Sequence, residues 1–192
     1  DRRADNLGLD PLPDIDFNIR CGNTLVGYAT EEELNRDLNF ETDILQVIAN
    51  KEFKEKVDKE MQLVSMAYDT FKYVQLNQGE DMVAFKQAKG ELKQRLASLN
   101  DTLNRRMHAA TQLDYEDWLK SHQPFHWLAE FYQIIKGNGG FDVIIGNPPY
   151  VEYTRRNKET GKSIAEIYQL HGYMTINCSN LYAFVTERSI QI

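Results

Sequence analysis

The longest regular pattern in the chain is helical. From residue 31 to about residue 107, apolar residues recur at spacings of three and four, with Lys, Glu and Gln between them. This spacing places the apolar side chains along one face of a helix. The first such stripe consists of Phe53, Val57, Met61, Val64, Tyr68, Phe71 and Val74, and the second of Phe85, Leu92, Leu96, Leu99, Leu103 and Met107. We therefore predict two long helices in an antiparallel hairpin, joined by a turn at residues 77–81 and with Asp81 capping the second helix.

Two shorter patterns flank the helical region. Residues 16–21 alternate polar and apolar side chains and lead into the tetrapeptide Gly-Asn-Thr-Leu at residues 22–25, which predicts a short strand followed by a turn. Residues 141–145 read Phe-Asp-Val-Ile-Ile and have a glycine on either side. A short apolar run bounded in this way predicts a buried strand.

Composition narrows the functional classes. The chain has 192 residues, enough for one domain or one and a half, and 42% of them are hydrophobic and 27% charged. Its formal net charge is −7, whereas a protein that grips duplex DNA by itself usually shows a basic face. The charge argues against a self-sufficient DNA clamp but is compatible with a catalytic portion whose DNA grip lies elsewhere.

Cysteine usage and hydropathy predict a cytoplasmic protein. Cys21 and Cys178 lie far apart without a CxxC pair, so neither a disulfide framework nor a metal site is predicted, and a reducing cytoplasm is expected. No run approaches the ~18 consecutive apolar residues of a membrane span. The start, Asp-Arg-Arg-Ala-Asp, is not a signal peptide. Because the sequence begins without Met and residues 181–192 read as a helix still in progress, we expect it to be a piece of a longer protein.

The segment after residue 146 offers the clearest chemistry. It reads Asn147-Pro148-Pro149-Tyr150. The side-chain oxygen of Asn147 and the carbonyl of Pro148 can accept hydrogen bonds from an amino group and stabilise the positive charge that develops when its nitrogen attacks a methyl donor. The prolines fix the backbone, and the ring of Tyr150 offers a face for an extruded base. A bare Asn-Pro would equally indicate an ordinary turn, so the preceding apolar run and the following Tyr favour the chemical interpretation.

Four stretches of the sequence form a recognisable set. They are residues 13–25, residues 124–127 (Pro-Phe-His-Trp), residues 141–151, and residues 180–184 (Asn-Leu-Tyr-Ala-Phe) with Glu-Arg at 187–188. Together they resemble the large bacterial DNA adenine-N6 methyltransferases of restriction-modification and phage-exclusion systems.

The resemblance implies roles for two groups of residues. Asn147, Pro148, Pro149 and Tyr150 would bind and activate a flipped-out adenine in DNA. Asn23 and Thr24 would contact the adenine of the cofactor, S-adenosyl-L-methionine. The family usually has Gly-Asp-x-Leu at this turn, so Asn23 replaces an acid and leaves the contact uncharged.

The resemblance also implies a fold. We expect a mainly helical α/β fragment that contributes part of a Rossmann-like methyltransferase sheet, with the long antiparallel helical hairpin as an insertion. Residues 1–30 would form a partial methyltransferase core with a strand and the cofactor-adenine turn. Residues 31–123 would form the helical insertion, and residues 124–192 the catalytic strand, the Asn-Pro-Pro-Tyr loop and the following helix. An incomplete sheet would expose an edge, so self-association of the fragment is expected as well.

The resemblance also indicates which parts are absent. The family's Phe-x-Gly-x-Gly loop, which wraps the methionine end of the cofactor, does not occur in the sequence. We therefore expect the chain alone to be inactive and to need the remainder of the same polypeptide. The expected substrate and partner is double-stranded DNA with adenine in its target site. Arg155, Arg156 and Lys158 are candidate contacts to DNA phosphates, and a solvated loop is the equal alternative.

A zinc site is not predicted. His122 and His126 have the spacing of four that zinc ligands on a helix use, but Pro124 lies between them and no third ligand is evident. Packing is the expected role of His126.

Two other functions remain open at the level of sequence. Enzymes that methylate a glutamine amide in proteins share the same tetrapeptide, because the amide and the adenine amine present similar geometry. The chain could also be a non-catalytic interaction module, in which a helical hairpin sits on a methyltransferase remnant.

Overall fold

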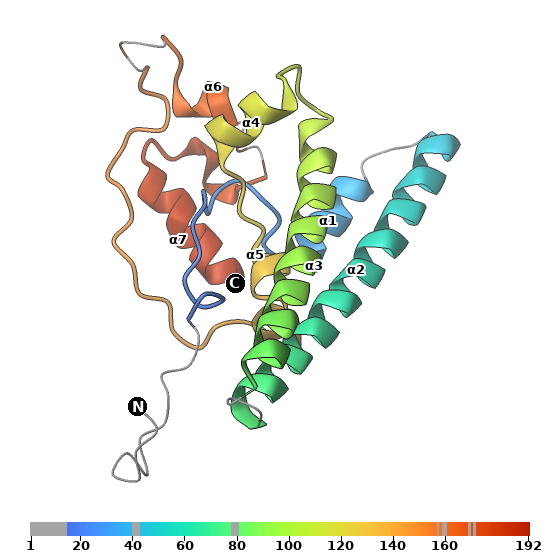
Figure 1. Ribbon diagram of the computed structural model, residues 1–192. Helices are drawn as coiled ribbons and strands as arrows, with labels where there is room; N and C mark the ends of the chain where they lie inside the picture. Colours follow the sequence, from blue (N-terminus) through green and yellow to red (C-terminus); the bar gives the residue numbers. More distant parts are fainter. Residues whose placement is uncertain are drawn as a thin grey trace.

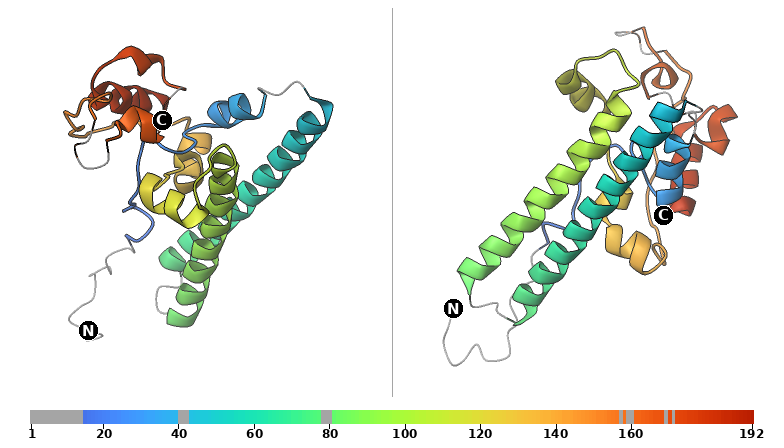
Figure 2. Two further views of the ribbon diagram at one scale, coloured as in Figure 1. Left: turned by 90° about the horizontal axis from the view of Figure 1, so that it is seen from above. Right: turned by 90° about the vertical axis from the view of Figure 1, so that its right-hand side faces the viewer.

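A pair of long antiparallel helices is the largest feature of the computed structural model. The structure describes residues 15–39, 43–77, 81–156, 158, 161–168, 170 and 172–192. The two helices are α2 (Ile44–Asn77) and α3 (Met82–His108), which run side by side in Figures 1 and 2. Asp81 caps α3, because its Oδ1 accepts hydrogen bonds from the backbone N–H groups of Val83 and Ala84, each at 3.0 Å. The predicted hairpin is confirmed, whereas residues 78–80 of its predicted turn lie outside the described residues.

The apolar stripes of α2 and α3 form the main core. Its buried members on the two helices are Val57, Met61, Val64, Ala67, Phe71, Val74, Ala88, Leu92, Leu96, Leu99 and Leu103. Burial of one Val, Leu or Phe side chain stabilises a fold by about 1.5–3 kcal/mol. Phe17 packs edge-to-face on Phe71 with ring centroids 4.9 Å apart, and Tyr28 and Leu128 belong to the same core. The hairpin therefore shares its core with segments that precede and follow it.

The remaining helices are short. They are α1 (Glu31–Leu38), α4 (Tyr115–His122), α5 (Trp127–Glu130), the π-helix η2 (Gln133–Gly137), α6 (Ile164–Tyr168), the 3₁₀-helix η3 (Met174–Asn177) and α7 (Leu181–Gln191). The side chain of Asn180 caps α7 by accepting from the N–H of Tyr182 at 3.3 Å. This is the helix predicted to follow the tetrapeptide. It forms a second core in which Phe184 packs with Leu25, Tyr153 and Tyr173.

The prediction that the chain contributes part of a Rossmann-like sheet is wrong. The described residues contain isolated bridges but no strand: Asn23 with Pro124, Glu152 with Asn180, and Arg156 with Ser163. Residues 16–18 form a turn instead of a strand. Residues 141–145 are irregular backbone, and the side chain of Ile145 is 92% exposed.

The physical reason is pairing. A strand persists when its backbone N–H and C=O groups bond to a neighbouring strand and one face is buried. Among the backbone bonds of residues 141–145, the structure gives Phe141 N–H to the carbonyl of Ile192, at 2.9 Å. Apolar composition alone therefore predicted a strand at a place where none of the described segments pairs with it as a neighbouring strand. The mainly helical character is confirmed, and the α/β class is not.

The described helices can also be compared with the requirements for a membrane span. Within the described part of the chain, no helix has both the length and the apolar character that crossing a bilayer requires. The three-part division at residues 30 and 123 stays a prediction.

Candidate active site

Two stretches almost a hundred residues apart lie together at the predicted cofactor turn. Residues 22–28 run parallel to residues 123–128, between the hairpin and α7 (Figure 1). The N–H of Asn23 donates to the carbonyl of Gln123 at 2.7 Å, and the N–H of Phe125 donates to Val26 at 2.7 Å. These bonds join two of the four stretches on which the resemblance rests.

The approach of these stretches depends on glycine. A Cβ added to Gly22 would lie 2.9 Å from Cβ of Phe125. At Gly27, φ is +135° and an added Cβ would lie 2.2 Å from the carbonyl oxygen of Phe125. Only glycine adopts this backbone conformation without strain and leaves room for the carbonyl.

The turn itself is held by the two side chains predicted to meet the cofactor. Oδ1 of Asn23 accepts from the N–H of Leu25 at 3.1 Å, which closes the turn locally. Oγ1 of Thr24 accepts from Nε1 of Trp127 at 3.0 Å. Both residues are half-buried, so each keeps part of its side chain accessible.

His126 is a neutral core residue that holds the backbone shortly after the turn. Its Nδ1 accepts from the N–H of Tyr28 at 3.0 Å, so the ring proton resides on Nε2, which lies 2.9 Å from Oδ1 of Asn104. Complete burial lowers its pKa to about 3. The predicted packing role is confirmed. His122 lies apart on α4, where Nε2 bonds the carbonyl of Ile167, and no group of three His, Cys, Asp or Glu among the described residues could hold a metal.

The segment that carries the tetrapeptide is tethered at its two ends to the first residue of α7 and to Ile192, the residue that follows α7. At its start, Phe141 donates to the last residue, Ile192, and its ring packs edge-to-face on Phe131 at 5.5 Å. At its end, the carbonyl of Val151 accepts from the N–H of Leu181 at 2.8 Å. Figure 1 shows the segment as a long trace beside α7.

The four tetrapeptide residues are largely accessible. Asn147, Pro149 and Tyr150 are exposed and Pro148 is half-buried. The ring of Tyr150 lies 6.1 Å from the ring of Tyr182 on α7, at an interplanar angle of 48°.

Tyr182 on α7 is 47% exposed, whereas Phe184 of the same helix is fully buried. The sequence signal for Tyr182 is its place in the first turn of α7, where a side chain can face the tetrapeptide.

The basic cluster after the tetrapeptide divides into two kinds of side chain. Arg156 is held by Glu166, with Nη2 to Oε1 at 2.8 Å, and it also donates to the carbonyl of Gly161. The side chains of Arg155 and Lys158 are exposed, and within the described residues neither pairs with a carboxylate. These two are the better placed of the three to meet phosphates.

The structure does not join the two predicted halves of the site by direct contact. Across the described residues, no hydrogen bond or ring contact links Asn23 or Thr24 to residues 147–150. Helix α7 contacts the backbone next to each half: Arg188 donates to the carbonyl of Gly27, and the N–H of Leu181 donates to the carbonyl of Val151.

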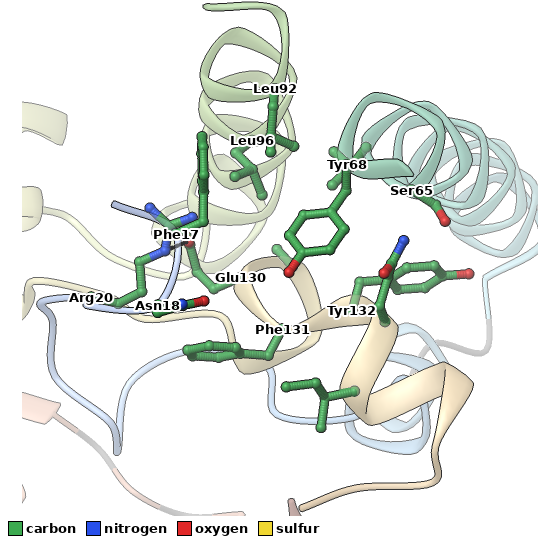
Figure 3. Close-up of a pocket in the computed structure, with 14 residues that line it drawn as sticks. Phe17, Asn18, Arg20, Ser65, Tyr68, Leu92, Leu96, Glu130, Phe131 and Tyr132 are labelled. Carbon is green, nitrogen blue, oxygen red and sulfur yellow. Dashed lines mark ion pairs between the residues drawn. The ribbon is translucent and has the colours of Figure 1, made fainter. Parts of the chain in front are cut away.

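A cavity elsewhere is too small for a cofactor. It lies between the hairpin, residues 17–20 and α5 (Figure 3), and its volume is about 60 Å³. Pockets for drug-sized ligands measure about 300–1,000 Å³. The guanidinium of Arg20 lies over the ring of Phe17 at 5.0 Å and pairs with Glu130 at 2.9 Å on its wall. No predicted site residue lines this cavity.

Comparison with known proteins assigns the class. The sequence model of the family described as Eco57I restriction-modification methylase matches residues 30–192, so the chain belongs to this family. The match covers the helical hairpin, the tetrapeptide and the basic cluster. It leaves Asn23 and Thr24 outside.

One relative gives a more particular likeness. A protein of Methanocaldococcus jannaschii, named as a type II restriction enzyme and methyltransferase, is 26% identical over 174 residues. The alignment covers 72% of this chain and 15% of the relative, so the chain spans about a seventh of that protein's length. No solved structure matches the chain.

Proposed function

We propose that the chain is part of the catalytic domain of a DNA methyltransferase that methylates the N6 amino group of a flipped-out adenine with S-adenosyl-L-methionine. We place it in a restriction-modification or phage-defence system. The observation that carries the proposal is the accessible tetrapeptide at residues 147–150, on a segment fixed at both ends to α7 and inside the region that matches the methylase family.

The tetrapeptide supplies the groups that amino methylation needs. Oδ1 of Asn147 and the carbonyl of Pro148 accept hydrogen bonds from the amino group, which concentrates the lone pair on nitrogen and stabilises its developing positive charge. S-adenosyl-L-methionine supplies an electrophilic methyl group and leaves as a neutral thioether when the nitrogen takes that methyl. The methylated nitrogen then releases one proton to water. Tyr150, which is 79% exposed, offers its ring to the base.

The turn at residues 22–25 fits the adenine end of the cofactor through hydrogen bonds without charge. Because Oδ1 of Asn23 is oriented by the N–H of Leu25, its amide nitrogen is left to donate to a ring nitrogen. Thr24 accepts from Trp127 and keeps its hydroxyl hydrogen for a ligand. An aspartate at this position would accept a hydrogen bond from the cofactor's adenine, whereas the amide nitrogen of Asn23 would donate one to it.

Double-stranded DNA is the proposed partner. Arg155 and Lys158 follow the tetrapeptide closely and are exposed, so they would reach phosphates beside the extruded base. The net charge of −7 supports a DNA grip that comes mostly from the remainder of the polypeptide.

The test uses the full-length protein that contains this chain, with methyl-labelled S-adenosyl-L-methionine and unmethylated DNA. Nucleoside analysis is expected to find the label in N6-methyladenine. Asn147→Ala is expected to lower the rate about 100-fold, the effect of removing one group that stabilises transition-state charge. Asn138→Ala is the matched control, since Asn138 is exposed and its side chain makes no hydrogen bond among the described residues.

Each of the other outcomes would indicate a different function for this protein. Label on a glutamine of a protein substrate would replace the proposal with a protein methyltransferase. Label in N4-methylcytosine would overturn the choice of adenine. If the wild-type protein transfers no label to DNA or protein, the interaction module is favoured.

A further inference from the structure

A buried arginine on α7 links three parts of the chain. Arg188 is 2% exposed, and its guanidinium forms a two-pronged ion pair with Glu33 of α1, at 2.7 Å and 3.1 Å. Its Nε donates to the hydroxyl of Tyr173 at 2.8 Å. Burying a guanidinium is costly unless its donors are satisfied, so these partners account for its place in the fold.

The same two side chains hold the backbone just after the cofactor turn. The hydroxyl of Tyr173 donates to the carbonyl of Leu25 at 3.1 Å, and Nη2 of Arg188 donates to the carbonyl of Gly27 at 3.4 Å. The carbonyl between them, that of Val26, accepts from Phe125. Burial raises the pKa of Tyr173, so its hydroxyl keeps the proton that it donates. Three consecutive carbonyls are thus fixed from two sides.

Helix α7 also fixes the tetrapeptide segment. The N–H of Leu181, the first residue of α7, donates to the carbonyl of Val151. The N–H of Phe141 donates to the carbonyl of Ile192, the residue that follows α7. One helix therefore connects to the cofactor turn through Arg188 and to both ends of the base-binding segment through its termini. Transfer between two bound groups is sensitive to displacements of about 1 Å, so a shared frame matters for the reaction.

We propose that Arg188 and Tyr173 are positioning residues that hold the turn at residues 22–25 in place for the adenine end of the cofactor. They act through the carbonyls of Leu25 and Gly27 and touch neither cofactor nor DNA. The inference rests on the proposed function.

Tyr173→Phe is the primary test in the full-length protein. It removes one hydroxyl and keeps the ring packing. The expected results are a rise of about three- to tenfold in the Kd and KM for S-adenosyl-L-methionine, an unchanged KM for DNA, and faster amide hydrogen exchange at residues 22–28 without cofactor. Arg188→Lys is the second variant. Lysine can pair with Glu33 but cannot also reach Tyr173 and Gly27, so cofactor binding is not rescued.

Thr175→Val is the matched control. Thr175 lies in η3, close to Tyr173 in the sequence, and its hydroxyl donates to Glu187 of α7 at 2.7 Å. The substitution removes this hydroxyl and changes no hydrogen bond to the turn. Cofactor binding is therefore expected to stay at the wild-type value. If Tyr173→Phe is folded and binds the cofactor as tightly as Thr175→Val does, the positioning role is refuted while the proposed function stands. A wild-type protein that binds no S-adenosyl-L-methionine would instead refute the proposed function.

Discussion

Two buried polar side chains, Arg188 and His126, are accommodated in opposite ways. Arg188 stays charged because Glu33 lies within 2.7 Å. In the part of the chain that the structure describes, no carboxylate pairs with His126, and its two ring nitrogens hydrogen-bond to neutral groups. A charged ring at this place would turn Nδ1 into a donor facing the N–H donor of Tyr28. The His126 site is therefore compatible with the neutral ring alone.

The neutral state of His126 predicts loss of stability in acid. Its pKa is about 3 in the folded protein, against about 6.5 for an unperturbed histidine, so in acid the unfolded chain binds the proton first. Between about pH 6 and about pH 3 this residue should lower the free energy of unfolding by about 1.4 kcal/mol per pH unit of acidification. Urea unfolding at several pH values measures the slope. His126→Gln, which cannot titrate, should show a shallower slope, and equal slopes would contradict the prediction.

Exposure of Tyr182 beside Tyr150 predicts a role in DNA binding. An aromatic pair contributes about 0.5–1.5 kcal/mol, so Tyr182→Ala should raise the KM for DNA about two- to tenfold, while Tyr182→Phe should not. Tyr73→Ala is the control, because Tyr73 is 59% exposed on α2, away from the tetrapeptide. Steady-state kinetics with the full-length enzyme decide the matter, and equal KM values for Tyr182→Ala and Tyr73→Ala would exclude the role.

At the scale of elements, the contact between residues 22–28 and residues 123–128 organises the site. The glycine at position 27 permits that contact because its φ is +135° and the carbonyl of Phe125 occupies the space of a Cβ.

Gly27→Ala should therefore destabilise the fold by about 3 kcal/mol or more, through strain and overlap together. Gly90→Ala is the matched substitution, since Gly90 is exposed on α3 and nothing lies within 4 Å of a Cβ added there. It should stabilise the protein by about 0.5–1 kcal/mol, because alanine favours a helix. Thermal unfolding of both variants gives the comparison. A Gly27→Ala protein as stable as the wild type would show that the close approach is not required.

The elements differ in how far the sequence predicted them, for a physical reason. The hairpin follows from local spacing, because apolar residues three and four apart define a helix face without reference to other segments. A strand depends on a distant partner, and the run at 141–145 looks the same with or without one. The tetrapeptide was found from its chemistry. The support from Arg188 was not, since the 155-residue separation from Glu33 leaves no periodic trace.

At the scale of the whole molecule, the helical hairpin shares its hydrophobic core with the rest of the protein, which an insertion that folds by itself would not need to do. Phe17, Tyr28 and Leu128, which come from outside it, share the core of α2 and α3. Oδ1 of Asn104 on α3 hydrogen-bonds to Nε2 of His126, and Nδ1 of His126 accepts from the N–H of Tyr28, close to the turn at residues 22–25. The hairpin thus supports the segments that form the candidate site.

This sharing predicts that a core substitution in the hairpin loosens the site. Leu99 of α3 is fully buried, so Leu99→Ala should cost about 2–5 kcal/mol of stability. If the two regions unfold as one unit, amide hydrogen exchange in the full-length protein should accelerate together in α3 and at residues 123–128. Leu76→Ala serves as the control, because Leu76 is 79% exposed on α2 and should leave both regions unchanged. Faster exchange confined to α2 and α3 in Leu99→Ala would show instead that the hairpin unfolds by itself, as an appended insertion would.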